Sequence, residues 1–189
     1  MSDFVHLHLH SDYSMLDGAC DVSDLCKRVK ALDMPAVAMT DHGNIFGAVH
    51  FFNAAKEAGV KAILGCELYI CKKDDHRATP EGDTYNHLLV LAENEEGYRN
   101  LTKIVSEASL HGFYYKPRVS KRFLSEHSKG LVGLSACLKG EVAERLVPDL
   151  AAVAERAAQQ MGGVDAPLVL TRRGDDVDCS TSARHAHNI

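Results

Sequence analysis

Apolar and polar residues follow regular spacings along most of the chain, and these spacings predict alternating strands and helices. Residues 4–10 alternate strictly, with Val5, Leu7 and Leu9 on one face and histidines on the other, which is typical of a half-buried strand. Short apolar runs predict four further strands, at residues 35–40, 61–70, 86–92 and 130–136.

Helical spacing fills the intervals between these strands. A helix over residues 21–33 is predicted behind the capping-type residues Asp21 and Ser23. Its apolar positions recur every three or four residues, at Val22, Leu25, Val29 and Leu32.

Two more long helices and two short ones are predicted further along. The helix over residues 45–58 ends at Gly59, and we expect its inward side chains to be Val49, Phe52 and Ala55. The helix over residues 94–110 starts at the cap Asn94 and is lined by Tyr98, Leu101, Val105 and Ala108. Short helices are predicted at residues 120–127 and 139–146, and a polar loop at residues 74–84.

Strands that alternate with helices of this length predict βα units and a parallel sheet. No glycine-rich phosphate-binding motif follows any strand, so a nucleotide-binding form of this architecture has no support. In βα barrels the loops after the strands form the active face. Chemically active side chains recur at the predicted strand ends: His8, His10, Asp41, His42, Glu67, His87 and Cys137.

Each of these residues also has a plain structural explanation. A His-x-His pair on a strand places two imidazoles about 7 Å apart on one face, which suits one metal or two adjacent ones, but it could be a solvated polar face. Asp41 could cap the following helix or orient a neighbouring ligand, whereas His42 is the better ligand. Taken singly, Glu67 and Cys137 are more often structural, but their joint placement at successive strand ends favours a metal centre.

The remaining histidines and cysteines are predicted to have no role in that centre. Four histidines lie in helices or polar loops and are predicted to be surface residues: His50, His76, His111 and His127. Four thiols are predicted to serve packing: Cys20, Cys26, Cys66 and Cys71. The six cysteines form no CxxC pair and no export signal is visible, so we expect reduced thiols in a cytoplasmic protein.

The bulk composition is that of an ordinary soluble globular protein, with 46% apolar and 25% charged residues. A net charge of −5 gives no electrostatic footprint of a nucleic-acid binder, although a local basic strip or bound cations can still hold phosphates. No run of 18 apolar residues occurs, so no membrane partner is expected.

Several stretches resemble the amino-terminal PHP (polymerase and histidinol phosphatase) domain of bacterial replicative DNA polymerase III alpha subunits. They are FVHLHLHSDYSMLDGA, AMTDHGNIFGAV, AILGCELY, NHLLVLAENEEGYRNLTKIVS and GLVGLSACLKGE, and the likeness runs from residue 4 to about residue 146. The resemblance implies an α/β fold, a distorted (βα)7 barrel that is incomplete here at its C-terminus.

The resemblance also implies the site and its cofactors. It implies up to three divalent metals in the intact domain, and the mixed donor set suits Zn²⁺, with Mn²⁺ or Fe as alternatives. Asp17 enters the set through the resemblance alone, Asp41 supports it from behind, and Asp17, Glu67 and His87 are the implied catalytic residues. The implied ligands are His8, His10, Asp17, His42, Glu67, His87 and Cys137.

The function implied is that of an N-terminal fragment of a DNA-directed DNA polymerase active in DNA replication. Its PHP domain would be a metal-dependent 3′→5′ proofreading exonuclease, with the DNA primer 3′ end and the rest of the polymerase III holoenzyme as partners. Two alternatives stay open: a free-standing phosphatase such as histidinol phosphatase, and a non-catalytic scaffold. The polymerase-type signature at residues 94–109 argues against the free-standing phosphatase.

The end of the chain departs from the family pattern. A late Asp-x-His ligand pair is missing, and residues 163–189 resemble nothing in the family; His185 and His187 in this stretch are taken as chance. We therefore expect a partial PHP domain over residues 1–162 and a polar tail without fixed structure over residues 163–189. The fragment alone is expected to be inactive and poorly stable.

Overall fold

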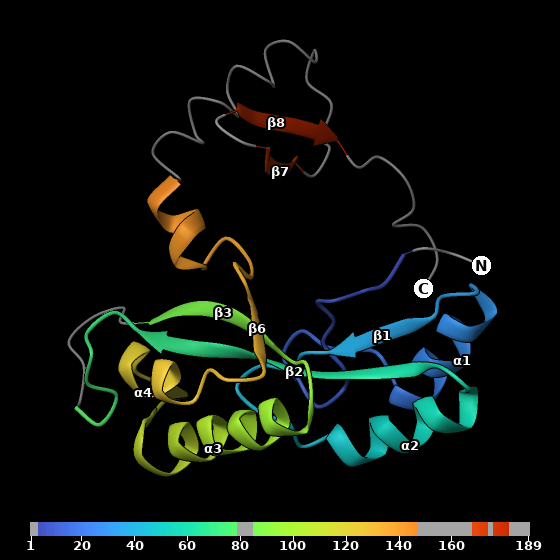
Figure 1. Ribbon diagram of the computed structural model, residues 1–189, viewed down its shortest axis with the longest axis horizontal. Coiled ribbons are helices and arrows are strands. Elements are labelled where there is room, and N and C mark those ends of the chain that lie inside the picture. The colour runs from blue at the N-terminus through green and yellow to red at the C-terminus, as the bar shows by residue number, and fades with distance from the viewer. Residues whose placement is uncertain (1–3, 79–84, 147–167, 174–175, 182–189) are drawn as a thin grey trace. The chain divides into compact units, whose positions relative to one another are not determined.

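The computed structural model describes residues 4–78, 85–146, 168–173 and 176–181. The chain divides into two compact units, Met1–Glu144 and Arg145–Ile189. The larger unit contains a mixed sheet with helices packed against it (Figure 1).

Six strands form the sheet of the larger unit, in the order β4-β5-β2-β3-β6, with β1 also paired to β2. Their bounds are β1 (Ala36–Met39), β2 (Lys61–Cys71), β3 (Tyr85–Ala92), β4 (Phe113–Tyr114), β5 (Lys116–Val119) and β6 (Leu131–Leu134). The four strands predicted from short apolar runs are confirmed as β1, β2, β3 and β6.

The sheet is mixed, and the prediction of a parallel sheet is wrong for β3, which runs antiparallel to both of its neighbours, and for the β4–β5 pair. β2 runs parallel to β1 and β5, but antiparallel to β3, which is itself antiparallel to β6. A parallel partner would need a crossover, usually a helix, and residues 72–78 after β2 form none, so the chain turns back beside β2. Among the described residues these strands form an open sheet and do not close into the expected (βα)7 barrel.

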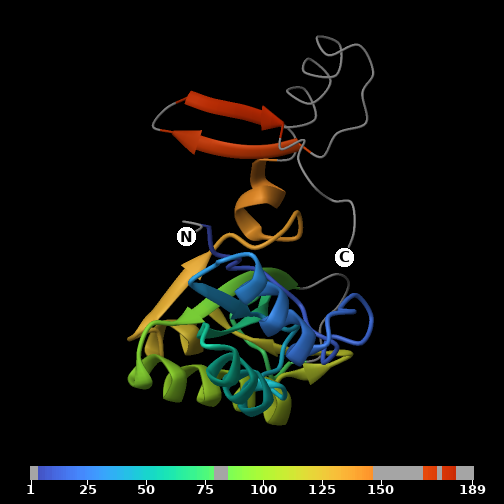
Figure 2. The same ribbon diagram turned by 90° about the vertical axis from the view of Figure 1, so that its right-hand side faces the viewer.

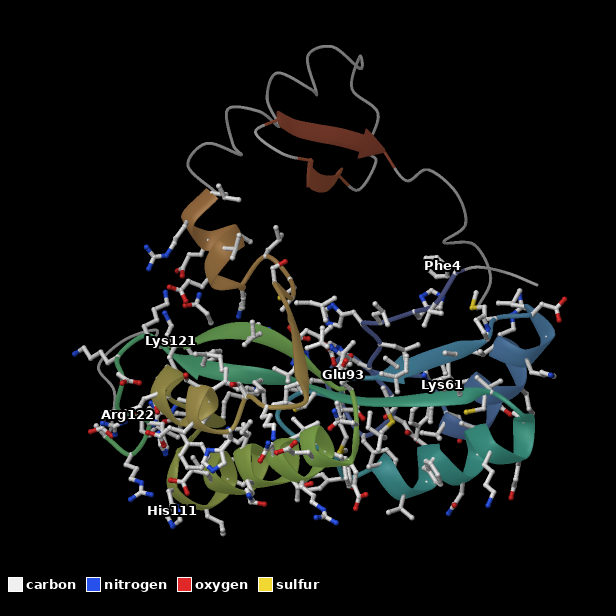
Figure 3. All side chains as sticks on the ribbon, in the orientation of Figure 1. Phe4, Lys61, Glu93, His111, Lys121 and Arg122 are labelled. Carbon is white, nitrogen blue, oxygen red and sulfur yellow. The ribbon has the colours of Figure 1, made fainter. Side chains whose placement is uncertain are left out.

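The first histidine-rich segment is extended but is not a full strand, contrary to the prediction. It lies beside β1, where the amides of Ala38 and Thr40 donate to the carbonyl groups of His6 and Leu9 at 2.8 Å each. Of its apolar residues only Leu9 packs against the core, whereas Phe4 lies on the outside (Figure 3). The segment sits at an edge of the sheet, so alternation alone does not bury its apolar face.

The first core cluster joins β1 to helices α1 (Val22–Ala31) and α2 (Ala48–Ala58). The predicted cap of α1 is confirmed, because the Asp21 side chain accepts a hydrogen bond from the amide of Asp24. Three of its predicted apolar positions reach the core, but Leu32 is the C-cap and stays exposed.

The inward face of α2 differs from the prediction. Phe51 and Ala55 are fully buried, whereas Val49 and Phe52 are 71% and 54% exposed. Two adjacent phenylalanines fit two different phases of the same helical period, so spacing cannot choose between them. The choice is made by packing: Phe51 fills the space against α1 and β1, and the helix ends at Gly59 in the left-handed conformation, as predicted.

This assignment of the α2 face can be tested with a matched pair of variants. Phe51→Ala is expected to lower the free energy of unfolding by about 3–5 kcal/mol, because it leaves a cavity in the core. Phe52→Ala removes an identical ring from the exposed face and is expected to change it by less than about 0.5 kcal/mol. Urea denaturation followed by circular dichroism measures both, and equal losses would contradict the assignment.

The second core cluster lies between α3 (Glu95–His111) and the strands β2, β3 and β5. α2 and α3 run along the same side of the sheet (Figure 1). The predicted cap of α3 is confirmed, since the Asn94 side chain accepts from the amide of Gly97 at 3.0 Å. Of the two predicted short helices, the first is α4 (Lys121–Glu126), and residues 141–146 are helical as well.

One histidine predicted for the surface is buried. His76 is only 6% exposed, because its Nε2 lies 2.9 Å from Glu107 of α3. His50 and His111 are exposed as predicted, and His127 is half-buried. Among the predicted packing thiols Cys26, Cys66 and Cys71 are buried, whereas Cys20 is half-buried.

The smaller unit contains one antiparallel strand pair, β7 (Leu168–Arg173) and β8 (Asp176–Thr181) (Figure 2). The expected division into a partial PHP domain over residues 1–162 and a tail over residues 163–189 stays a prediction. His185 and His187 lie outside the described residues. In the part of the chain that the structure describes, no helix is both long and apolar enough to cross a membrane.

Candidate metal centre

Strand β2 carries the central residue of the site on one of its two faces. Cys66, Leu68 and Ile70 point into the core beneath α3. Because side chains alternate along a strand, Glu67 and Tyr69 lie on the opposite face, and the Glu67 side chain is 99% buried there.

Strand β3, the antiparallel partner of β2, brings His87 close to Glu67. His87 lies near the start of β3 and pairs with Tyr69, so its predicted place at the end of a strand is wrong. It still reaches the site, because the start of an antiparallel strand meets the end of its neighbour. Lys61 begins β2 and Glu93 directly follows β3, so both lie at the strand ends away from this site (Figure 3).

Strand β6 pairs antiparallel with β3 and leads to Cys137, the last of the seven predicted ligands. Cys137 lies three residues after the end of β6, and its Sγ is 3.4 Å from His87 Nδ1. Cys137 is exposed, whereas His87 is buried, so the thiol lies at the rim of the site.

Glu67 is the hub of the histidines. Its Oε2 lies 2.8 Å from His8 Nε2 and 2.7 Å from His10 Nε2, and these two imidazole nitrogens are 3.2 Å apart. Its Oε1 lies 2.6 Å from His87 Nδ1, and His42 Nδ1 is 3.7 Å from Oε2. One buried carboxylate therefore meets four imidazoles from three separate parts of the chain.

Asp17 closes the site on its exposed side. Its Oδ2 lies 3.0 Å from His10 Nδ1 and 2.8 Å from His42 Nε2. Within the described residues, three groups have ligand atoms close enough to share a metal ion: His8, His10 and Glu67; His10, Asp17 and His42; His42, Glu67 and His87. The groups share members, so they describe one continuous cluster.

Asp41 shapes the loop that carries Asp17. The Asp41 carboxylate is fully buried and accepts from the Ser11 amide at 2.7 Å and from the Ser11 and Ser14 hydroxyl groups at 2.8 Å each. Ser14 Oγ in turn accepts from the amide of His42 at 3.0 Å. The alternative that Asp41 caps the next helix is wrong, because α2 begins after Gly47.

Electrostatics in the cluster favour charged carboxylates. Burial alone raises the pKa of Glu67, but hydrogen bonds from His10, His8 and His87 outweigh it and hold this pKa well below its usual range. The hydrogen bond to Glu67 raises the pKa of His10. Burial lowers the pKa of His42, only partly offset by Asp17, so its imidazole tends to be neutral.

The donor set fits divalent metals. Within the described residues, His42 Nδ1 is the one buried side-chain nitrogen or oxygen without a hydrogen-bond partner. A neutral imidazole has one unprotonated nitrogen with a free lone pair. Where such a nitrogen is buried beside a carboxylate without a hydrogen-bond donor, a metal ion can satisfy it. Imidazole nitrogens, carboxylate oxygens and a rim thiol together suit Zn²⁺, Mn²⁺ or Fe.

The structure brings all seven predicted residues together, and their roles as ligands stay predictions. Sequence reasoning missed three residues of the site: Tyr69, Ser11 and Ser14. The Tyr69 ring stacks on His42, with centroids 5.8 Å apart, and meets His87 edge-on at 5.1 Å. Its position two residues after Glu67 was an available signal, since both share one face of a strand. The serines gave no comparable signal.

A mixed α/β domain that gathers four histidines around one buried carboxylate has the donor set of a divalent-metal site. Residues 6–164 match the PHP domain family, and the chain belongs to this family.

Its relatives include DNA polymerase III alpha subunits. That of Helicobacter pylori strain 26695 is 52% identical over 74% of this chain and 11% of its own length. The subunit of Treponema pallidum is 46% identical over 86% of this chain and 14% of its own length. The subunit of Thermus aquaticus is 45% identical over 80% of this chain and 13% of its own length. The chain thus spans about an eighth of the relatives it matches. An amidohydrolase structure from Chromobacterium violaceum gives a TM-score of 0.38 at 24% identity, over 55% of this chain and 34% of the other.

Proposed function

We propose that this PHP domain is a metal-dependent phosphoesterase whose metals are held by the Glu67 cluster. The observation that carries the proposal is the convergence of four imidazoles on one buried carboxylate, with His42 Nδ1 left without a partner among the described residues. A purely structural carboxylate would be satisfied by one or two donors, and burying a carboxylate costs stability unless its partners compensate for the lost water.

Each residue has a distinct task in this proposal. Glu67 directs Oε2 toward His8 and His10 and Oε1 toward His87, and together with His42 these residues would hold the divalent metals. The Asp17 side chain is 45% exposed and lies where the cluster opens to solvent. It therefore faces the direction from which a phosphate substrate would enter. Asp41 holds the Asp17 loop through Ser11 and Ser14. Divalent metals supply, when bound, the positive charge that stabilises phosphate oxygens and acidifies a water molecule for attack.

The substrate we propose is the 3′ end of a DNA primer. The names of the relatives support a role in DNA replication, in which the intact protein is a DNA polymerase III alpha subunit of the cytoplasm that works with DNA and the holoenzyme. In that setting the PHP domain removes misincorporated nucleotides as a 3′→5′ exonuclease. A histidinol-phosphatase-like function is the second candidate within the same family, and it would use the same metals on a small phosphate ester.

A substrate comparison tests the proposal. The intact protein that carries this domain is incubated with Mn²⁺ or Zn²⁺, without nucleotides, on a labelled primer with a mismatched 3′ end and separately on histidinol phosphate. We expect stepwise shortening of the primer that a chelator abolishes. Release of phosphate from histidinol phosphate alone would favour the small-molecule phosphatase. Bound metal without cleavage of either substrate would leave only the scaffold alternative and would refute the proposal.

A further inference from the structure

The β4–β5 hairpin places aromatic rings in solvent beside the sheet. Phe113, Tyr114 and Tyr115 are 64%, 40% and 82% exposed. Phe113 pairs with Pro117 and Tyr114 pairs with Lys116, so Tyr115 alone forms the tip. Three consecutive exposed aromatic residues carry a solvation cost that a merely structural turn would avoid.

The tip residue has an unfavourable backbone conformation. Tyr115 has a φ of +56°, in the left-handed region that glycine enters without cost. A large side chain at such a position is strained, by roughly 1 kcal/mol. Tyr115 is 82% exposed and its ring contacts only the Tyr114 ring among the described residues, so little within the fold offsets this strain, which points to a role for the side chain outside the fold.

The buried side chain of Arg118 anchors the hairpin to the rest of the fold. Arg118 is 3% exposed and donates to the carbonyl groups of Gly112 and His76 at 3.1 and 3.2 Å. Its guanidinium group lies 5.6 Å from the Tyr114 ring centre, and the Tyr114 ring meets Tyr115 edge-on at 4.7 Å. The exposed rings therefore stand on a fixed base, which lowers the entropy cost of binding through them.

The same hairpin adjoins the metal centre. Gly43, directly after His42, leaves room for Pro117 and Tyr69: a Cβ there would lie 2.6 Å from Pro117 Cγ and 2.9 Å from a Tyr69 ring carbon. Lys116 Nζ lies 5.6 Å from the centre of the Tyr69 ring, which in turn stacks on His42. Lys116 forms no ion pair with a carboxylate in the described residues.

We infer that the β4–β5 hairpin is a binding element for single-stranded nucleic acid that feeds the metal centre. Bases stack on Tyr115 and Phe113, and Lys116 binds a backbone phosphate between these rings and the Glu67 cluster. Exposed aromatics beside a cation are how sequence-tolerant single-strand sites are built, because every base offers a π-face and every linkage a phosphate. The inference rests on the proposed function. It extends that function from the phosphate that reacts to the nucleic-acid strand that contains this phosphate.

Equilibrium binding without metal tests the inference apart from catalysis. The full chain is titrated into a fluorescein-labelled oligo-dT of 15 nucleotides at low salt in the presence of EDTA, and anisotropy is recorded. We expect saturable binding that Tyr115→Gly and Phe113→Ala each weaken about tenfold, as loss of one stacked base predicts. Lys116→Gln should weaken binding and reduce its salt dependence, because one phosphate contact is lost.

Tyr115→Gly separates a binding role from a structural one. Glycine relieves the positive φ, so the melting temperature should stay the same or rise while binding falls. Phe52→Ala, which removes an exposed ring from α2, should leave binding unchanged. No binding by the parent chain, or unchanged binding by Tyr115→Gly, would overturn the inference, the second result favouring a protein partner for the hairpin. Binding with these variant effects but no cleavage by the intact protein would refute only the proposed phosphoesterase function.

Discussion

Replacing Glu67 by glutamine is expected to abolish metal-dependent phosphate ester cleavage in the intact protein and to lower metal affinity by on the order of 100-fold or more. The carboxylate lies within 2.8 Å of His8, His10 and His87, so the loss of its charge affects every part of the cluster at once. Metal content by mass spectrometry and the primer-shortening assay measure the two effects, and circular dichroism shows whether the variant is folded.

Glu107→Gln is the matched control for this variant. Glu107 also contacts two histidines, His76 at 2.9 Å and His111 at 2.8 Å, and the hydrogen bonds from Arg77 and His76 lower its pKa to about 2. It lies outside the groups of ligand atoms that could share a metal. We expect unchanged metal content for Glu107→Gln. Equal metal loss in both variants, or full metal binding by Glu67→Gln, would contradict the assignment of the centre.

Changing Asp17 to asparagine is expected to abolish cleavage while the fold is retained. The substitution removes a negative charge at nearly constant volume from the side of the cluster that opens to solvent, which lowers metal affinity and weakens the field on the scissile phosphate. The rate of primer shortening at saturating Mn²⁺ is the measurement. Asp12→Asn, an exposed aspartate of the same loop, should retain the parent rate.

A rate at saturating metal that equals the parent rate would show that Asp17 is not needed for the reaction. A thermal melt of the same sample guards against misreading an unfolded variant. The melting temperature should shift little, since the Asp17 side chain is 45% exposed and the loop is held mainly by Asp41, Ser11 and Ser14.

Local sequence alone predicted most of the secondary structure and six of the seven candidate ligands. Asp21 and Asn94 cap their helices as predicted, because a cap needs only a short polar side chain and the amides of the next turn. The His-x-His pair, His42 and Glu67 stood out because ligand-type side chains recur at successive predicted strand ends, where the loops of a βα fold form the active face. Asp17 was predicted only from the resemblance, since it lies in a loop whose apolar and polar residues show no regular spacing.

Tertiary structure decided what short-range spacing leaves open. Strand direction depends on how the chain crosses between strands, so β3 and β6 run antiparallel to their neighbours although their composition is equally suited to a parallel sheet. Phe51 rather than Phe52 is buried, because only packing against α1 and β1 distinguishes the two phases of one helix. The Glu67 hub itself arises from contacts across 20 to 59 positions of sequence, and no local pattern encodes such a distance.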